Sequence, residues 1–302
     1  MLWMARAIRL RWLCIVLAIV LTAIGFVPSL RAQAPTNGLI MLIEFEKIDG
    51  IRHWERELDR RGLTALVQAQ ANVLKEYPDD FARLAAKGYV ISGIDAEKPF
   101  WDVAYDDQLA RMREVKQSVE RITHKRMRVF GSRYFAYDEN TLRAADALDI
   151  EYVLGRGTAG ALATIYAARE YKAKIISVSN VPFAEMGTGS LCDYSLWARG
   201  STGEEFGSVV DKVLASGHSD LILVSHAYLG GLYVEWWRVY EAALANKHVT
   251  WRSFDQWVGS VKVAAQPLAE IPVNREVKYD VPKPAVPLQK LQPLPELQRK
   301  TD

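Results

Sequence analysis

Four charged side chains stand at the end of the apolar segment Leu39–Phe45 and just after it. They are Glu44, Glu46, Lys47 and Asp49. A strand that ends in carboxylates just before a helix is a common place for catalytic bases and metal ligands in α/β enzymes. Lys47 complicates that interpretation, because a charged ammonium group has three donors and no acceptor and cannot ligate a cation.

A second pair of acids, Asp95 and Glu97, follows the apolar segment Tyr89–Ile94. If the two segments are neighbouring strands of a parallel sheet, their acids lie at the same edge. Hard carboxylate oxygens suit Mg²⁺, Ca²⁺ or Mn²⁺ better than zinc. The candidate cation ligands are Glu44, Asp49, Asp95 and Glu97. His53, one helical turn beyond Asp49, could add a nitrogen, although its charged surroundings also fit a surface position.

Strands and helices alternate along the chain. Seven apolar segments predict strands, at 38–45, 64–70, 89–94, 127–130, 152–154, 175–178 and 221–225. Amphipathic segments predict helices at 50–61, 72–87, 106–122, 139–148, 204–216, 234–245 and 254–263, with Asp138 as the cap of the fourth and Trp236 and Trp237 in the core. This α/β pattern predicts a parallel sheet, and seven strands favour a (β/α) barrel. No glycine-rich phosphate loop follows the first strand, which argues against a dinucleotide.

Residues 1–34 have the features of a secretory signal. Arginines 6, 9 and 11 precede an apolar run from Leu13 to Val27, and Ala32-Gln33-Ala34 is a small-x-small cleavage site. We therefore expect a periplasmic or secreted protein, with an uncleaved N-terminal membrane anchor as the alternative. Cleavage leaves 34 basic and 36 acidic side chains and one cysteine. This near-neutral chain lacks a basic footprint for nucleic acid, so we expect no nucleic-acid partner.

The last segment, residues 267–302, contains seven of the twelve prolines. Prolines alternating with lysine, glutamine and leucine favour an extended, polyproline-like arm. The arm either docks, on its own domain or on a partner, or is a disordered end. The sequence thus divides into a leader (1–34), a barrel domain (38–266) and a Pro-rich C-terminal arm (267–302).

The order of these segments resembles the NodB-type polysaccharide deacetylases, carbohydrate esterase family four. The resemblance runs from about Gly38 to Val263. The similar stretches are Leu39–Phe45 with its acidic end, 63–67 with 77–79 and 85–88, Met127–Phe135 with 138–142, and Asp220–His226. The resemblance implies a distorted (β/α) barrel that removes acetyl groups from N-acetylated sugars with a bound divalent cation.

Family roles can be carried onto this chain only in part. The family uses an aspartate base, a metal held by one aspartate and two histidines, and a late histidine acid. Glu46 stands at the base position, Lys47 at the metal-binding aspartate, and His226 at the catalytic histidine. The histidine pair, expected near Ile94 and Lys98, is missing. The resemblance therefore implies a divergent member that lacks the family's metal triad.

Other side chains are candidates for glycan contact. Aromatic residues on loops at the barrel mouth stack on sugar rings, or simply pack. The candidates are Trp101, Arg133, Tyr134 and Trp197, the last in a segment, Asp193–Trp197, that resembles part of the family's fourth motif. Cys192 has no histidine or other base nearby in the sequence, so we interpret it as inert. The sequence contains no Gly-x-Ser-x-Gly elbow, which argues against a serine esterase.

Two hypotheses remain open. In the first, the site is an altered deacetylase in which Glu46 is the base, His226 is the acid, and either carboxylates hold a cation or Lys47 and Lys98 replace its charge. In the second, the chain is a non-catalytic glycan-binding or interaction subunit of a periplasmic or membrane-associated assembly. Salt-bridged acids at a barrel mouth need no catalytic explanation. Its C-terminal arm and aromatic loops would then contact the glycan or protein partner.

Overall fold

The computed structural model describes residues 35–101, 103–157, 162–183, 187–272, 284 and 286–295. The predicted signal, residues 1–34, and the arm residues 273–283, 285 and 296–302 lie outside this part of the chain. Residues 35–302 form one compact unit. Across the described ranges, no helix is long and apolar enough to cross a membrane.

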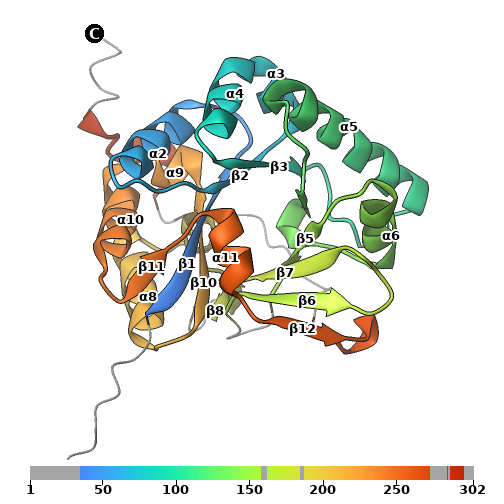
Figure 1. The fold of residues 1–302 in the computed structure, drawn as a ribbon. Coiled ribbons are helices and arrows are strands. Elements are labelled where there is room, and N and C mark those ends of the chain that lie inside the picture. Colours follow the sequence, from blue (N-terminus) through green and yellow to red (C-terminus); the bar gives the residue numbers. More distant parts are fainter. Residues whose placement is uncertain are drawn as a thin grey trace, which may run out of the picture. The chain divides into compact units, whose positions relative to one another are not determined.

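A curved, mostly parallel sheet is the centre of this unit (Figure 1). Its parallel strands, in spatial order, are β10 (Asp220–His226), β1 (Thr36–Glu44), β2 (Leu66–Ala69), β3 (Val90–Asp95), β4 (Val129–Ser132), β5 (Tyr152–Arg156) and β7 (Lys174–Val178). These are the seven strands that the sequence predicts, and they confirm the distorted (β/α) barrel. Each is buried on both faces, which explains why it reads as a continuous apolar run.

Five further strands complete the described sheets. β6 (Thr164–Ala168) pairs antiparallel with β7, β12 (Val263–Gln266) pairs with β6, and β11 (Val249–Trp251) pairs with β1. β8 (Asn180–Pro182) and β9 (Thr188–Ser190) form a separate two-stranded sheet.

Helices cover the outer face of the curved sheet (Figure 1). They are α2 (Asp49–Asp59), α3 (Ala71–Glu76), α4 (Pro78–Ala86), α5 (Tyr105–Thr123), α6 (Glu139–Ala147), α8 (Gly203–Ala215) and α10 (Val234–Ala245), with the short α7 (Asp193–Trp197) and α9 (Ala227–Gly230). Among the described helices, α11 (Phe254–Ser260) packs instead with the residues inside the barrel. Pro78 at the start of α4 splits the predicted 72–87 helix in two, because proline fits the first turn but not a helix interior. Asp138 caps α6 through the backbone N–H of Thr141, as predicted.

The alternation of side chains along β1 defines two apolar layers. Ile40 and Leu42 pack with the helices, as do Trp236 and Trp237 in the predicted core of α10. Leu39, Met41 and Ile43 face the inside of the barrel, in a cluster that Phe254 and Trp257 of α11 also join. Because the strands are parallel, their carboxyl ends meet at one rim.

The barrel is closed between β7 and β10 by irregular chain. The hydroxyl of Ser179, just after β7, accepts a hydrogen bond from Ile222 N at 2.9 Å. Leu191 N donates to Ser179 O at 3.0 Å, and Val224 N donates to Leu191 O at 3.0 Å. These bonds bring the segment that leads into α7 against the end of β10.

Part of the Pro-rich arm docks on its own unit. Leu294 N donates to Leu232 O at 2.8 Å, and Val234 N donates to Gln292 O at 3.0 Å. Leu291 and Leu294 are each 6% exposed. Residues 286–295 are therefore part of the packed structure beside α10.

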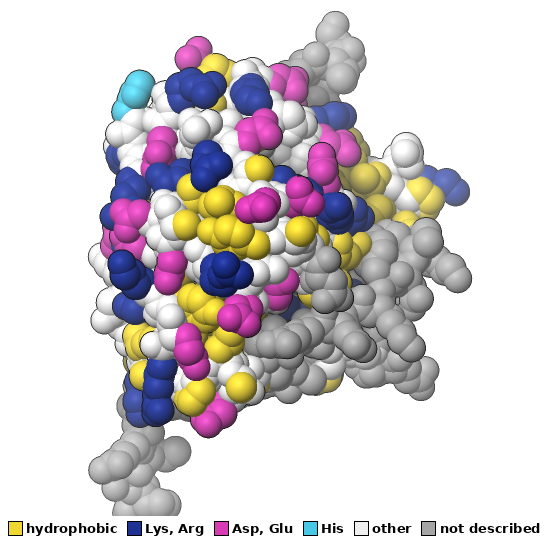
Figure 2. Space-filling model, turned by 90° about the vertical axis from the view of Figure 1, so that its right-hand side faces the viewer, with side chains coloured by type: hydrophobic (Ala, Val, Ile, Leu, Met, Phe, Trp, Pro, Cys, Tyr) yellow, Lys and Arg dark blue, Asp and Glu magenta, His cyan; other side chains and the backbone are white. Residues whose placement is uncertain are grey.

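One face of the unit shows how its charge is distributed. In Figure 2, basic and acidic side chains lie interspersed around a limited hydrophobic area. Such mixing agrees with the near-neutral composition of the predicted mature chain.

Candidate functional site

A cavity of about 350 Å³ opens at the carboxyl ends of the strands. Alternate residues of a strand point to the same face of the sheet. A residue two places beyond the last inward-facing core residue of a strand therefore points into the mouth of the barrel. The residues that line it are Ile43, Phe45, Glu46, Gln70, Ile94, Ala96, Ser132, Arg133, Tyr134, Phe135, Arg156, Ser190, Cys192, Tyr194, Ser195, Val224, His226 and Tyr228. Both predicted catalytic residues, Glu46 and His226, are among them.

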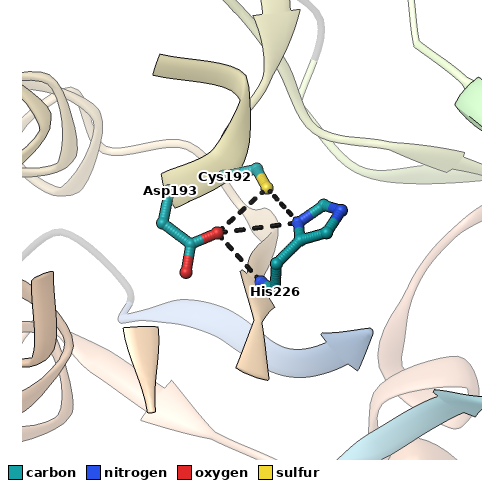
Figure 3. Close-up of side chains that lie close together, drawn as sticks. All are labelled: Cys192, Asp193 and His226. Atoms are coloured by element: carbon teal, nitrogen blue, oxygen red, sulfur yellow. Dashed lines mark hydrogen bonds and ion pairs between the residues drawn. The ribbon is translucent and has the colours of Figure 1, made fainter. Parts of the chain in front are cut away.

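His226 lies in a buried cluster with Cys192 and Asp193 (Figure 3). Its Nδ1 atom is 3.1 Å from Cys192 Sγ and 3.6 Å from Asp193 Oδ1. The other ring nitrogen points away from both residues in Figure 3. The imidazole is 8% exposed and borders the cavity, so this second nitrogen is the atom through which His226 can exchange a proton with a ligand.

Asp193 fixes the position of His226 and of the adjoining turn. Its Oδ1 atom accepts from the backbone N–H groups of Tyr194 at 2.6 Å and His226 at 2.9 Å. Its Oδ2 atom accepts from Gly230 N at 3.0 Å and Ser225 Oγ at 2.9 Å. This fully buried carboxylate therefore links α7, β10 and α9.

Cys192 has the basic neighbour that its local sequence lacks, since His226 is 34 residues away along the chain. The local sequence could not show this neighbour, which the fold brings beside the thiol. The thiol is nevertheless 1% exposed, and burial, with the neighbouring Asp193 carboxylate, raises its pKa well above the ordinary value. A buried thiol of raised pKa is a poor nucleophile and a poor metal ligand.

The predicted carboxylate ligands lie in different environments. Asp95 accepts from Arg111 Nε at 2.6 Å, and Glu97 accepts from Arg111 Nη2 at 2.9 Å. Asp49 is half exposed in the first turn of α2, 3.8 Å from Arg52. The structure therefore neutralises these three acids with arginines and does not bring them together at one point. The described residues include no ion pair of Lys47, so that lysine is not what balances them.

Glu44 points away from the cavity into the layer beneath the helices. Its Oε1 atom accepts from the backbone N–H groups of the next three residues at 2.9, 2.9 and 3.2 Å, and Oε2 is buried without a partner. Burial raises the pKa of Glu44 to about 7. His53, expected either beside Asp49 or at the surface, is instead 4% exposed and packs edge-on against Trp237.

These donors do not fit the divalent cation of the family. Among the described residues, Cys192, Asp193 and His226 are the one set of three ligand-type side chains whose atoms lie within 4.8 Å of one another. Both oxygens of Asp193 accept protein hydrogen bonds, and Cys192 is held as a thiol. Binding a cation there would break the bonds that hold α9 in place.

The predicted glycan contacts divide into two pairs. Arg133 and Tyr134 line the cavity. Trp197 Nε1 donates to Val286 O at 2.9 Å under the C-terminal arm. Within the described part of the chain, neither Trp197 nor the half-buried Trp101 lines the cavity.

Sequence reasoning missed two of the lining residues, Tyr228 and Arg156. Tyr194 and Tyr228 flank the His226 ring, with centroids 4.7 and 5.8 Å from it. Arg156, the last residue of β5, is 8% exposed and reaches the cavity. The sequence did contain a signal for Arg156. It lies two residues beyond Leu154 on an apolar strand, so its side chain is expected to point to the inside of the barrel as that of Leu154 does.

No family model matches the sequence, and no curated protein does. Solved structures match the fold. One, described as a polysaccharide deacetylase from Mycobacterium smegmatis, is 11% identical with a TM-score of 0.61, and the match covers 80% of this chain and 98% of that one. Another, a mutant of a CE4 family pseudoenzyme with restored enzymatic activity, is 8% identical with a TM-score of 0.52, covering 75% and 68%.

A third match is the 4-alpha-glucanotransferase from Thermococcus litoralis, with 10% identity and a TM-score of 0.56. It covers 78% of this chain, which spans only 42% of that protein. Together these likenesses show that the chain has the NodB-type, distorted (β/α) barrel fold of polysaccharide deacetylases. At such low identity they establish the fold, and roles for residues rest on the geometry of this chain.

Proposed function

We propose that this chain is a deacetylase-like protein that binds an N-acetylated or related glycan in the rim cavity, with the family's metal-dependent deacetylation lost or altered. One observation carries the proposal. The cavity combines Glu46, His226 and several aromatic side chains, while Cys192, Asp193 and His226, the one set of clustered ligand-type side chains among the described residues, are engaged with one another and with the backbone.

The lining suits a sugar. Phe45, Tyr134, Tyr194 and Tyr228 offer aromatic faces, and Gln70 with three serines offers hydrogen-bonding groups. Sugar rings have apolar faces and polar edges, so a cavity with both kinds of surface complements them.

Hydrolysis without a metal is the second candidate, because Glu46 and His226 border the same cavity. Glu46 could take a proton from water as the water attacks an acetyl carbonyl. His226, which Asp193 holds in position, could give a proton to the leaving amine.

The decisive experiment measures acetate release and binding in the same preparation. Purified protein is incubated with N-acetylglucosamine oligomers, with a chelator or with Mg²⁺, Ca²⁺, Mn²⁺ or Zn²⁺, and binding is followed by calorimetry. We expect binding of the oligomers and no cation-dependent release of acetate. Glu46→Gln and His226→Gln variants report on chemistry, and Arg113→Gln, an exposed change on α5, serves as the control.

The outcomes separate the candidates. Acetate release that requires a divalent cation would contradict the proposal. Release in the presence of chelator, lost in Glu46→Gln and His226→Gln, would establish metal-free hydrolysis instead. No binding of any oligomer would favour the alternative of a non-catalytic subunit that contacts a protein partner.

The proposal includes a location outside the cytoplasm. It is supported by the basic start, apolar run and cleavage site of residues 1–34. Processing after Ala34 would appear in the intact mass of the purified protein.

A further inference from the structure

Arg156 is a buried cation in the floor of the cavity. The described residues contain no acidic partner for it. Its one hydrogen bond runs from Nη2 to Thr188 O at 3.3 Å, and its Nε atom is buried without an acceptor. A charged group so deeply buried is normally paired or fully hydrogen-bonded. The residues that the structure describes therefore leave the hydrogen-bonding capacity of this guanidinium largely unused.

The direction of Arg156 follows from its strand. Tyr152 and Leu154 of β5 face the inside of the barrel, so the residue two places further points into its mouth. Arg156 accordingly lines the cavity beside Tyr134 and Ser190.

The charges around Arg156 are mostly positive. Arg133 lines the same cavity, and Arg199 donates to the carbonyl of Thr188, which Arg156 also contacts. The one acid in the lining, Glu46, is exposed and follows β1, which three strands separate from β5 in the sheet order. Burial, with Arg199 nearby, lowers the pKa of Arg156 to about 10, which still leaves the side chain charged at neutral pH.

We propose that Arg156 binds the carboxylate of an acidic sugar in the cavity. This inference deepens the proposed function, on which its glycan part rests. A guanidinium presents paired donors that match the two oxygens of a carboxylate. Arg133 and Arg199 already donate to backbone carbonyls, which leaves Arg156 as the donor group for a single carboxylate. The remaining hydroxyl and aromatic groups of the lining are left for the sugar ring.

The test follows the side chain itself. In ¹⁵N-labelled protein, the arginine Nε–H signals are recorded while D-glucuronate, glucose or glucose 6-phosphate is added, and Arg156→Met identifies the signal of Arg156. We expect glucuronate to shift this signal and glucose to leave it unchanged. Calorimetry with uronic-acid oligomers should show binding weakened by about tenfold to a hundredfold in Arg156→Met.

Two further variants exclude a merely structural effect. Arg156→Lys keeps the charge but loses the paired donors, so it should recover only part of the affinity. Arg113→Gln removes an exposed positive charge on α5 and should bind as the unaltered protein does. Arg156→Met removes an unpaired buried cation, so its thermal midpoint should be unchanged or higher.

Each outcome bears on a different claim. Binding of neutral oligomers without any response of Arg156 to glucuronate would overturn this inference and leave the proposed function intact. A response of Arg156 to glucuronate without binding of any oligomer would overturn the proposed function alone. A stronger, Arg156-dependent response to glucose 6-phosphate would overturn the choice of a carboxylate.

Discussion

Two buried ionisable side chains, Glu44 and Arg156, end their strands on opposite faces of the sheet. Glu44 follows Leu42, which packs with the helices, whereas Arg156 follows Leu154, which faces the inside of the barrel. The same alternation that orders the core therefore turns the carboxylate away from the cavity and the guanidinium towards it. Neither charge has an ionic partner among the described residues, but only Arg156 can meet a ligand.

Glu44 makes stability depend on pH. Its pKa is about 7 in the folded protein and near 4.5 when unfolded, so the folded state binds the proton more tightly. The resulting stabilisation is complete below about pH 4.5 and is lost as the pH rises to about 7. In Glu44→Gln we expect this loss, up to about 3 kcal/mol, to disappear.

Urea unfolding of the unaltered protein and of Glu44→Gln between pH 4.5 and 7.5 measures the difference. The free energies of unfolding should diverge as pH rises, with the variant becoming relatively more stable. Glu46→Gln, which removes an exposed carboxylate two residues further on, controls for the change in net charge. Parallel curves for the unaltered protein and Glu44→Gln would contradict the expected titration.

Sequence reasoning located some cavity residues and could not locate others. Glu46 and His226 follow apolar strands, so both were found at the rim. The pairing of Cys192 with His226 depends on how chain after β7 crosses to β10, which no local pattern encodes. Asp95 was assigned correctly to the end of a strand, but its pairing with Arg111 depends on how α5 packs, and this removed it as a ligand.

At the scale of elements, long periodic segments were predictable and short ones were not. The seven barrel strands and the long helices have strong apolar patterns. The strands β6, β11 and β12 are short and partly exposed, and α7 and α9 have at most five residues. These short elements are held in place by tertiary hydrogen bonds, such as those of Asp193. Their own sequences therefore show little apolar periodicity.

The contact between α2 and α9 shows this dependence. A Cβ atom at Gly50 would lie 2.0 Å from the carbonyl oxygen of Ala227. Gly50→Ala should therefore push α9 and the His226 segment away and destabilise the protein by about 2–3 kcal/mol. Thermal or urea unfolding measures this change.

Gly259 in α11 is the matched control for this substitution. A Cβ atom there would meet nothing within 4 Å. Gly259→Ala should be stabilising by about 0.5–1 kcal/mol, because alanine loses less backbone entropy in a helix. Equal destabilisation by both substitutions would show that the close approach of α2 and α9 is not responsible.

At the scale of the whole molecule, the described residues 286–295 of the arm belong to the fold. The sequence left open whether residues 267–302 dock or are disordered, and the structure docks residues 286–295 beside α10 and over Trp197. That contact could not be derived from composition, because a proline-rich segment has the same extended form whether bound or free.

Removing residues 286–302 tests what the docked segment contributes. The deletion exposes the surface that Leu291 and Leu294 cover, and we expect a loss of about 3 kcal/mol or more in the free energy of unfolding. It also frees Trp197, whose fluorescence should shift to the red. Removal of residues 296–302 alone leaves both leucines in place and is the control. Unchanged stability in the longer deletion would show that docking is weak.

The position of β1 has a consequence for how the chain folds. This first strand lies between β2, its neighbour in sequence, and β10, whose Asp220 bonds to Asn37 across a separation of 183 residues. Closing so long a loop is slow compared with the formation of local helices. Until β10, in the last third of the chain, has been synthesised, one edge of the mostly apolar strand β1 has no partner and can pair wrongly. This topology therefore needs protection from aggregation during folding.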